Sequence, residues 1–208
     1  MKSVLISIRP QWCEKICNKI GKDENGKPIY EKRIEVRKSA PSEVPFKAYI
    51  YATKPKKFFK CGAMSTSDEL LWLANGKVEM GDGFKFWADG DEYQRLNGRI
   101  IGEFICRGIM QPFDSLRLMA KESCLTEEEL VTYSNGKPLY GWHISDLKIY
   151  DKPKELSEFR PICKFEGKDL ICNLCPNHEY NGGLFFECRR KVTRPPQSYM
   201  RVKELKEV

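Results

Sequence analysis

Three charged residues on and just before a predicted strand have the side chains that nucleotide recognition needs: Lys32, Glu35 and Arg37. On a strand, side chains two positions apart share a face, so Glu35 and Arg37 point together while Ile34 and Val36 point the other way. The planar guanidinium of Arg37 suits a phosphate group, and Glu35 can accept a hydrogen bond from the exocyclic amine of a base. A cross-strand ion pair on a solvated strand is the alternative interpretation.

Glu103 and His143 lie on two later predicted strands and extend the candidate site toward catalysis. We expect the strand of Glu103 to neighbour the strand of Glu35. A lysine, a carboxylate and an imidazole in one cleft can act as general acids and bases, so Lys32, Glu35, Glu103 and His143 form a candidate catalytic set. For His143, a hydrogen-bonded packing role is the alternative.

Two tryptophans accompany these residues, Trp12 ahead of them and Trp142 next to His143. Either ring can line the cleft and stack on a base. Both can equally be core residues, because large rings dominate the interior of small β folds.

Four cysteines toward the C-terminus have the spacing of a metal site: Cys163, Cys172, Cys175 and Cys188. A Cys-x-x-Cys turn lets two thiolates bind one zinc ion, and two further cysteines complete a tetrahedral set, with His178 as a spare ligand. A site of four thiolates has no open position, so the zinc that we expect is structural. Reduced, buried cysteines without a metal are the alternative, as we expect for Cys13 and Cys17 in the first helix.

Two basic segments can follow a phosphate backbone. The first surrounds Phe58 and Phe59, the second follows the cysteines, and their cations are Lys54, Lys56, Lys57 and Lys60, then Arg189, Arg190, Lys191 and Arg194. A charge run is more often a solvated face, so either segment alone is weak evidence.

Charge and composition favour a polyanionic partner and exclude a membrane span. The 208 residues include 36 Lys and Arg against 29 Asp and Glu, a net charge of +7. Such a surplus attracts RNA or a nucleotide, and DNA is also possible. No run of apolar residues is long enough to span a bilayer, the first residues do not form an export signal, and the nine cysteines are an odd number. We therefore expect a cytoplasmic protein.

The pattern of apolar residues predicts several strands and a few short helices. We expect strands at 4–8, 34–37, 46–52, 99–106, 142–150 and 195–202, and a hairpin between 77–80 and 84–87. Trp12, Ile16 and Ile20 form one stripe of a helix that begins at Pro10 and ends at Gly21, before a turn at 23–28. Another short helix is expected at 67–74, and a third follows Thr126, which has Glu129 at the spacing of a capping box.

Together these segments resemble the ASCH domain family of the PUA-like fold. The resemblance rests on residues 7–12, 32–37, 97–104, 140–144 and 195–198. It implies a small β-barrel with a helix across one end and a cleft that in relatives holds RNA, a nucleotide or a modified nucleoside. One branch of the family resembles a ribonuclease and another is an acetylcytidine amidohydrolase. Where the amidohydrolases have their threonine this chain has Glu35, which is the more general ASCH pattern.

The sequence thus predicts an α+β fold, a small mixed β-barrel in a single domain over residues 1–208. Residues 54–97 are expected to be an insertion between strands, and 160–192 a cysteine-rich segment before the last strand. The predicted function is binding of RNA or a nucleotide in a cleft with Lys32, Glu35 and Arg37. A hydrolase acting on RNA or a modified nucleoside is the first alternative, and a protein-interaction adaptor that uses the insertion is the second.

Overall fold

The computed structural model describes residues 1–54, 59–60, 63–64, 69–73, 77–81, 93–112, 115–163, 178–180, 186–188 and 190–205. Over these residues the fold is mixed α and β, mostly strands with three short α-helices. None of the helices in the described part of the chain is long and apolar enough to cross a membrane.

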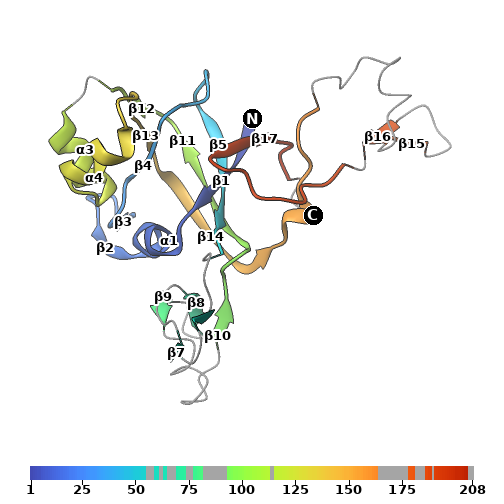
Figure 1. The fold of residues 1–208 in the computed structure, drawn as a ribbon, viewed down its shortest axis with the longest axis horizontal. Helices are drawn as coiled ribbons and strands as arrows, with labels where there is room; N and C mark the ends of the chain where they lie inside the picture. Colours follow the sequence, from blue (N-terminus) through green and yellow to red (C-terminus); the bar gives the residue numbers. More distant parts are fainter. Residues whose placement is uncertain are drawn as a thin grey trace.

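A five-stranded sheet forms the centre of the molecule (Figure 1). Its order is β14–β11–β5–β1–β17, with bounds β14 Ser145–Lys154, β11 Ile100–Cys106, β5 Phe46–Ala52, β1 Lys2–Ile8 and β17 Tyr199–Val202. β1 and β5 run parallel, and the other neighbours are antiparallel. β1 and β5 are buried along nearly their whole length, because both faces of the central strands are covered.

A second sheet, β12–β13–β4, packs beside the first and carries the candidate site. It consists of β12 Ile109–Met110, β13 Tyr140–His143 and β4 Ile34–Arg37. One face, with Ile34 and Val36, packs under helices α3 Leu116–Ser123 and α4 Glu127–Ser134. From the other face, Trp142 enters the main core with Phe46. The described strands do not join the two sheets into a closed barrel, so the barrel remains a prediction.

The first helix, α1 Pro10–Cys17, is shorter than the sequence predicts. Proline at its first position has no N–H to leave unsatisfied, and Cys13 and Ile16 are buried against the core. The chain then turns into the hairpin of β2 Lys19–Lys22 and β3 Pro28–Tyr30. Ile20 therefore lies on a strand and is 57% exposed, and its predicted place in the helical stripe is wrong. The turn at 23–28 is confirmed, with Asp23 accepting hydrogen bonds from two backbone N–H groups.

The capping box that begins α4 is confirmed. The Thr126 hydroxyl accepts from the N–H of Glu129 at 3.0 Å, and the Glu129 carboxylate accepts from the N–H of Thr126 at 2.8 Å. The helix ends at Ser134, and the residue that caps it, Asn135, adopts a left-handed conformation with φ 45°.

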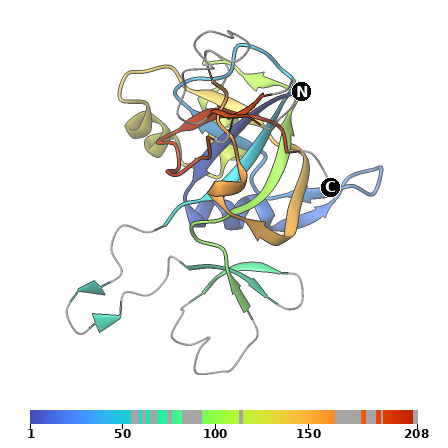
Figure 2. The ribbon, with the colours of Figure 1, turned by 90° about the vertical axis from the view of Figure 1, so that its right-hand side faces the viewer.

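The region predicted as an insertion holds its own small sheets, drawn below the body in Figures 1 and 2. A three-stranded sheet β10–β8–β9 lies beside α1, and a hairpin joins β6 and β7. The bounds are β6 Phe59–Lys60, β7 Ala63–Met64, β8 Glu69–Leu73, β9 Val78–Gly81 and β10 Tyr93–Arg95.

The helix predicted at 67–74 is wrong, because β8 is the central strand of that sheet. It makes ladders with both β9 and β10, and these hydrogen bonds outweigh the local helical pattern. β9 therefore pairs with the strand before it, and the expected partner at 84–87 lies outside the described residues.

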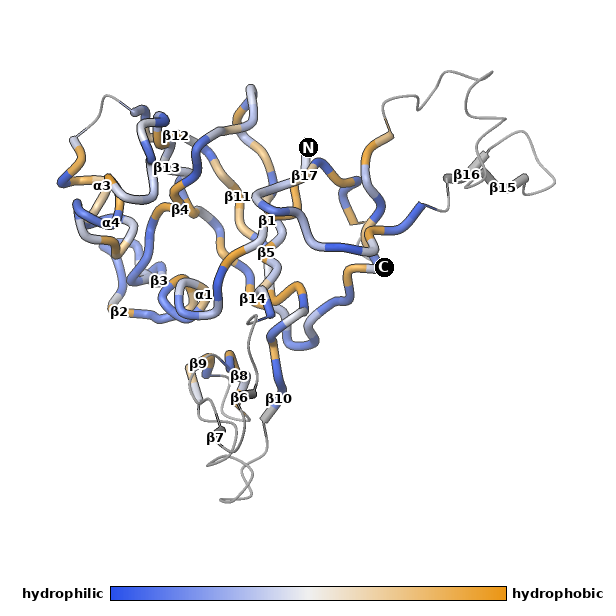
Figure 3. Tube along the Cα trace, viewed as in Figure 1, coloured by the Kyte–Doolittle hydropathy of each residue, from blue (hydrophilic) through white to orange (hydrophobic). Residues whose placement is uncertain are grey.

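The C-terminal part of the chain completes the fold. The strand predicted at 142–150 is divided into β13 and β14 at Ile144, and the last strand is shorter than predicted, with 195–198 in coil. A 3₁₀ turn, η1 Leu156–Glu158, follows β14, and β15 His178–Tyr180 pairs with β16 Phe186–Cys188. Figure 3 shows apolar residues along parts of β11, and Ile101, Phe104 and Cys106 of this strand belong to the main core.

Candidate functional site

Lys32, Glu35 and Arg37 form a buried charged cluster at β4. Lys32 Nζ lies 3.4 Å from Glu35 Oε2, and Arg37 Nη2 lies 3.0 Å from Glu35 Oε1. The three residues are only 2%, 6% and 7% exposed. The alternative interpretation, an ion pair on a solvated face of the strand, is therefore wrong.

Neighbouring elements hold both cations through backbone carbonyls. Lys32 Nζ donates to the carbonyl of Ser123, the last residue of α3, at 2.8 Å. Arg37 Nη2 donates to the carbonyl of Ser7 in β1 at 2.6 Å. The sequence could not reveal these two carbonyls as partners, because every residue carries one.

Two polar atoms of the cluster, Glu35 Oε2 and Arg37 Nε, are buried and have no hydrogen-bond partner among the residues that the structure describes. The contact of Oε2 with Lys32 is an ion pair at 3.4 Å without hydrogen-bond geometry. Buried polar atoms are nearly always hydrogen-bonded, and an unsatisfied one costs about 1–3 kcal/mol. The described protein groups therefore leave one acceptor and one donor of the buried cluster unsatisfied.

Trp12 belongs to the cluster, whereas Trp142 is a core residue. Lys32 Nζ lies 5.4 Å from the centroid of the Trp12 ring, a cation–π contact, and Trp12 remains partly exposed. Trp142 is fully buried, its ring meets Phe46 and Tyr199 edge to face, and its N–H donates to the Ser39 carbonyl. A base therefore has no open face of Trp142 on which to stack.

Cys13 lies beside the cluster and stays a neutral thiol. Burial raises its pKa well above the usual range, and the nearby Glu35 carboxylate raises it further. Its Sγ contacts the Ile8 carbonyl at 3.8 Å. The prediction that Cys13 is a packing residue is confirmed.

Glu103 is not a member of this site, because β11 neighbours β5 and β14 and not β4. Its carboxylate lies 3.3 Å from Lys47 Nζ and accepts a hydrogen bond from the Tyr150 hydroxyl at 2.5 Å. Lys47 also pairs with Glu204 at 2.9 Å, close to the C-terminal end. The prediction that the strand of Glu103 lies next to the strand of Glu35 is therefore wrong. Glu103 instead belongs to an ion-pair network with Lys47 and Glu204.

His143 also lies apart from the charged cluster. It is exposed at the end of β13, where its register partner is Ile34, which points to the helical side of the sheet. Its backbone N–H donates to the Gly108 carbonyl at 3.1 Å. The structure thus brings together Lys32, Glu35, Arg37 and Trp12, but neither of the two predicted assisting residues.

The predicted zinc and phosphate-backbone residues are only partly covered by the described structure. Cys163 carries a free thiol, and Cys188 is paired in register with His178 across β15 and β16. Lys54 and Arg190 are exposed. Cys172, Cys175, Lys57 and Arg189 lie outside the described residues. Within the described residues alone, no cluster of three metal-binding side chains is found.

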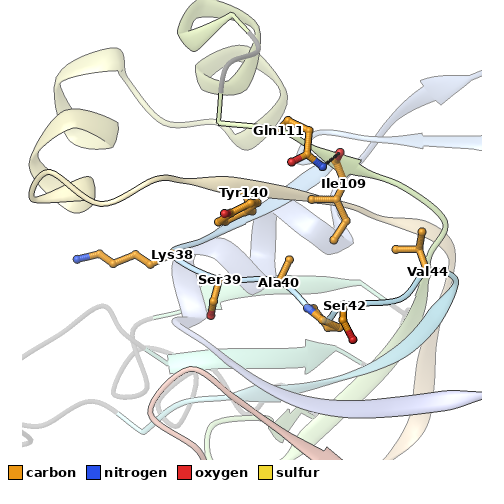
Figure 4. A pocket seen from close by; sticks show the side chains of 9 residues that line it. Lys38, Ser39, Ala40, Ser42, Val44, Ile109, Gln111 and Tyr140 are labelled. Atoms are coloured by element: carbon orange, nitrogen blue, oxygen red, sulfur yellow. Dashed lines mark hydrogen bonds between the residues drawn. The ribbon is translucent and has the colours of Figure 1, made fainter.

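A cavity of about 540 Å³ lies at the end of β4, between the 38–44 segment and residues of β12 and β13, and no member of the charged cluster lines it (Figure 4). Lys38, next to Arg37 in the chain, extends from one end of it, and Tyr140 is the register partner of Arg37. Ile109 and Tyr140 form one wall and Ala40 faces them from the 38–44 segment. The Gln111 amide at the rim donates to the Ile109 carbonyl at 3.3 Å. Sequence patterns did not single out these residues, because they come from three separate segments.

No model of a known protein family matches the chain, and no curated protein matches it. Among solved structures, the chain is similar to ASCH proteins. A crystal structure of a point mutant of ASCH from Zymomonas mobilis shares 16% sequence identity with a TM-score of 0.44, covering 98% of this chain and 92% of that one. The unmutated ASCH structure from the same organism shares 17% identity with a TM-score of 0.42, covering 98% and 89%. This is the family that the sequence motifs resemble. At such low similarity no residue role is transferred, and the chemistry rests on the residues described above.

Proposed function

We propose that the protein is an RNA- or nucleotide-binding module of the ASCH type, with a small mixed β-barrel fold that holds its ligand at the Lys32–Glu35–Arg37 cluster. The observation that carries the proposal is the pair of buried atoms without partners, Glu35 Oε2 and Arg37 Nε. They offer an acceptor beside a donor, and the edge of a nucleobase presents the complementary pair, an amine or imino N–H beside a carbonyl or ring nitrogen.

The charge of the cluster favours an anionic ligand. Two cations and one carboxylate leave one positive charge that is uncompensated within the buried cluster. Buried charge without a counter-charge is costly, so a phosphate group nearby would be stabilised. The cavity that begins at Lys38, the residue after Arg37, would provide room for the remainder of a nucleotide, and the Trp12 ring is partly exposed.

Ligand entry at Arg37 passes the coil segment 195–198. Ser7, whose carbonyl binds Arg37, donates from its hydroxyl to the Pro196 carbonyl at 2.6 Å and from its N–H to the Ser198 carbonyl at 3.1 Å. This segment belongs to the motif shared with the ASCH family. We expect it to move aside when a ligand approaches, because the cluster is otherwise enclosed.

Binding is favoured over catalysis. The hydrolase alternative needs groups that assist Lys32 and Glu35, and both Glu103 and His143 lie elsewhere. Free thiols such as Cys13 and Cys106 suit the cytoplasm, where we place the protein, since that compartment keeps cysteines reduced.

The test is direct binding to short fluorescent RNA, single-stranded DNA and mononucleotides at low salt. Arg37→Lys keeps the charge but loses the planar guanidinium, so we expect the Kd to rise about tenfold. Arg107→Lys is the matched control, because Arg107 is exposed and pairs with Asp146 away from the cluster. Equal Kd values for the two variants, in folded protein, would contradict the proposal, as would the absence of binding to every probe. Turnover of RNA or of a modified nucleoside that disappears in Glu35→Gln would support the hydrolase instead.

We further propose that a structural zinc ion stabilises the C-terminal cysteine segment. Support comes from the β15–β16 register, which sets His178 directly opposite Cys188, because paired Cα atoms in an antiparallel ladder lie about 4.5–5.5 Å apart. Elemental analysis of purified protein should give about one zinc per chain, lost in Cys172→Ser. A metal content equal in the two proteins would overturn this assignment.

A further inference from the structure

A second cavity, of about 450 Å³, lies where the β8–β9 hairpin meets the end of α1. In Figures 1 and 2 the sheet that contains this hairpin lies directly beside α1. Its walls come from the end of α1 with β2, from Tyr30 in β3, from the β8–β9 hairpin and from Ile149 in β14. Ligand sites are common where two substructures meet in this way.

The lining combines two aromatic rings with two cations. Tyr30 and Trp72 are partly buried, so each retains some exposed ring surface. Lys19 and Lys77 are exposed at the rim. Lys77 pairs with Glu79 on its own hairpin at 2.7 Å, and Glu79 is not a lining residue. None of the described residues that line the cavity is acidic.

The Cys17 thiol in the wall is protonated at neutral pH. Burial raises the pKa of Cys17 to about 12, with a smaller contribution from Glu14. The nucleophile and the metal ligand of a cysteine is its thiolate, so Cys17 serves neither role here. The chemistry of the cavity is therefore that of its rings and its cations.

We propose that this cavity is a second nucleotide-binding site, in which a base packs against Trp72 and Tyr30 while its phosphate contacts Lys19 and Lys77. Stacking on aromatic rings combined with cations along the backbone is how proteins hold single-stranded nucleic acid. The inference rests on the proposed function for the class of ligand, but it concerns a different place in the fold.

The two sites are neighbours along α1. Trp12 of the first site and Cys17 in the wall of the second are five residues apart on the helix, about 7–8 Å along its axis. A short RNA strand that reaches both sites binds through two contacts. Once the first contact has formed, the second forms within the same complex, at a high effective concentration. An oligonucleotide should therefore bind more tightly than a free mononucleotide, which occupies each site independently.

The test uses the full chain labelled with 5-fluorotryptophan and followed by fluorine NMR. The protein has four tryptophans, and the resonances of Trp12 and Trp72 are assigned with Trp12→Phe and Trp72→Phe. We expect both a mononucleotide (uridine or adenosine monophosphate) and a five-nucleotide RNA to shift the Trp72 resonance. Lys19→Ala should raise the Kd read from that resonance about tenfold. The control is Lys27→Ala, because Lys27 is exposed in the turn between β2 and β3, the hairpin that also contains Lys19. This variant should change the Kd less than about twofold.

The pattern of shifts separates this inference from the proposed function. A shift at Trp12 without one at Trp72 overturns the second site and leaves the first intact. A shift at Trp72 alone supports the second site and contradicts the ligand site at β4. Equal Kd values in Lys19→Ala and Lys27→Ala also overturn the second site. If only the RNA shifts Trp72, the ligand is a strand; if both ligands shift it equally, the site binds the mononucleotide unit.

Discussion

At Glu35, one carboxylate lies between two cations in the interior of the protein. Desolvation makes such clusters costly, and they contribute little net stability compared with apolar residues of the same size. Removing a single member is different, because the remaining charges stay buried without compensation. The cluster is therefore expected to respond strongly to any change of charge.

Glu35→Gln should destabilise the fold by about 3–5 kcal/mol, because it leaves Lys32 and Arg37 without their shared counter-ion. Urea unfolding followed by circular dichroism measures the change. Asp146→Asn removes an exposed partner of Arg107 and should cost at most about 1 kcal/mol. A loss for Glu35→Gln as small as that of the control would mean that water reaches the cluster.

Cys17 should make the stability depend on pH in the alkaline range. Burial raises its pKa from 9.0 to about 12 in the folded protein. Its contribution is complete below pH 9, where the unfolded thiol is also neutral, and is lost as the pH rises from there toward 12. At pH 10 the loss is on the order of 1 kcal/mol. Between pH 8 and pH 10, the free energy of unfolding should fall less in Cys17→Ala than in the wild type. Equal falls in the two proteins would show that the pKa of Cys17 is not raised by folding.

At the scale of elements, β11 leaves no room for a side chain beside β14 at Gly102. A Cβ atom added there would lie 2.5 Å from the Lys148 carbonyl oxygen, which belongs to the backbone and cannot swing away. The ladder also shifts register on either side of this contact. The glycine thus permits the sheet to curve around the core.

Gly102→Ala should therefore cost about 1–3 kcal/mol through overpacking. Gly21→Ala is the matched control, because a Cβ there meets nothing within 4 Å, and it should be neutral or stabilise by up to about 1 kcal/mol. Thermal unfolding of the two variants provides the comparison. A melting temperature for Gly102→Ala at or above that of Gly21→Ala would show that the two strands separate readily.

Which elements the sequence predicted depends on where their determinants lie. The capping box at Thr126 and the turn at Asp23 are local, and both were predictable from neighbouring residues. β8 looked helical over a few residues, but its two flanking strands decide its conformation. α1 ends at Cys17 because the following hairpin begins there, a preference that the stripe through Ile20 did not reveal.

At the scale of the molecule, the pairing of strands decides which predicted site residues meet. Glu35 and Arg37 share a face because their spacing is local, so their association could be foreseen. Placing Glu103 or His143 required the order of strands across both sheets, which the sequence does not encode in any short pattern. The same holds for both cavities, whose walls come from segments far apart in the chain.

The most direct test of the central proposal observes the unpaired guanidinium nitrogen itself. In protein labelled with ¹⁵N-arginine, the Nε–Hε signal of Arg37 is assigned by its loss in Arg37→Lys, and short RNA or a mononucleotide is then added to saturation. We predict that this signal shifts and that its hydrogen exchange slows, because Nε gains an acceptor from the ligand, while the signal of exposed Arg107 changes little. An Arg37 signal that stays unchanged while ligand is demonstrably bound would contradict the proposal that this cluster is the binding site.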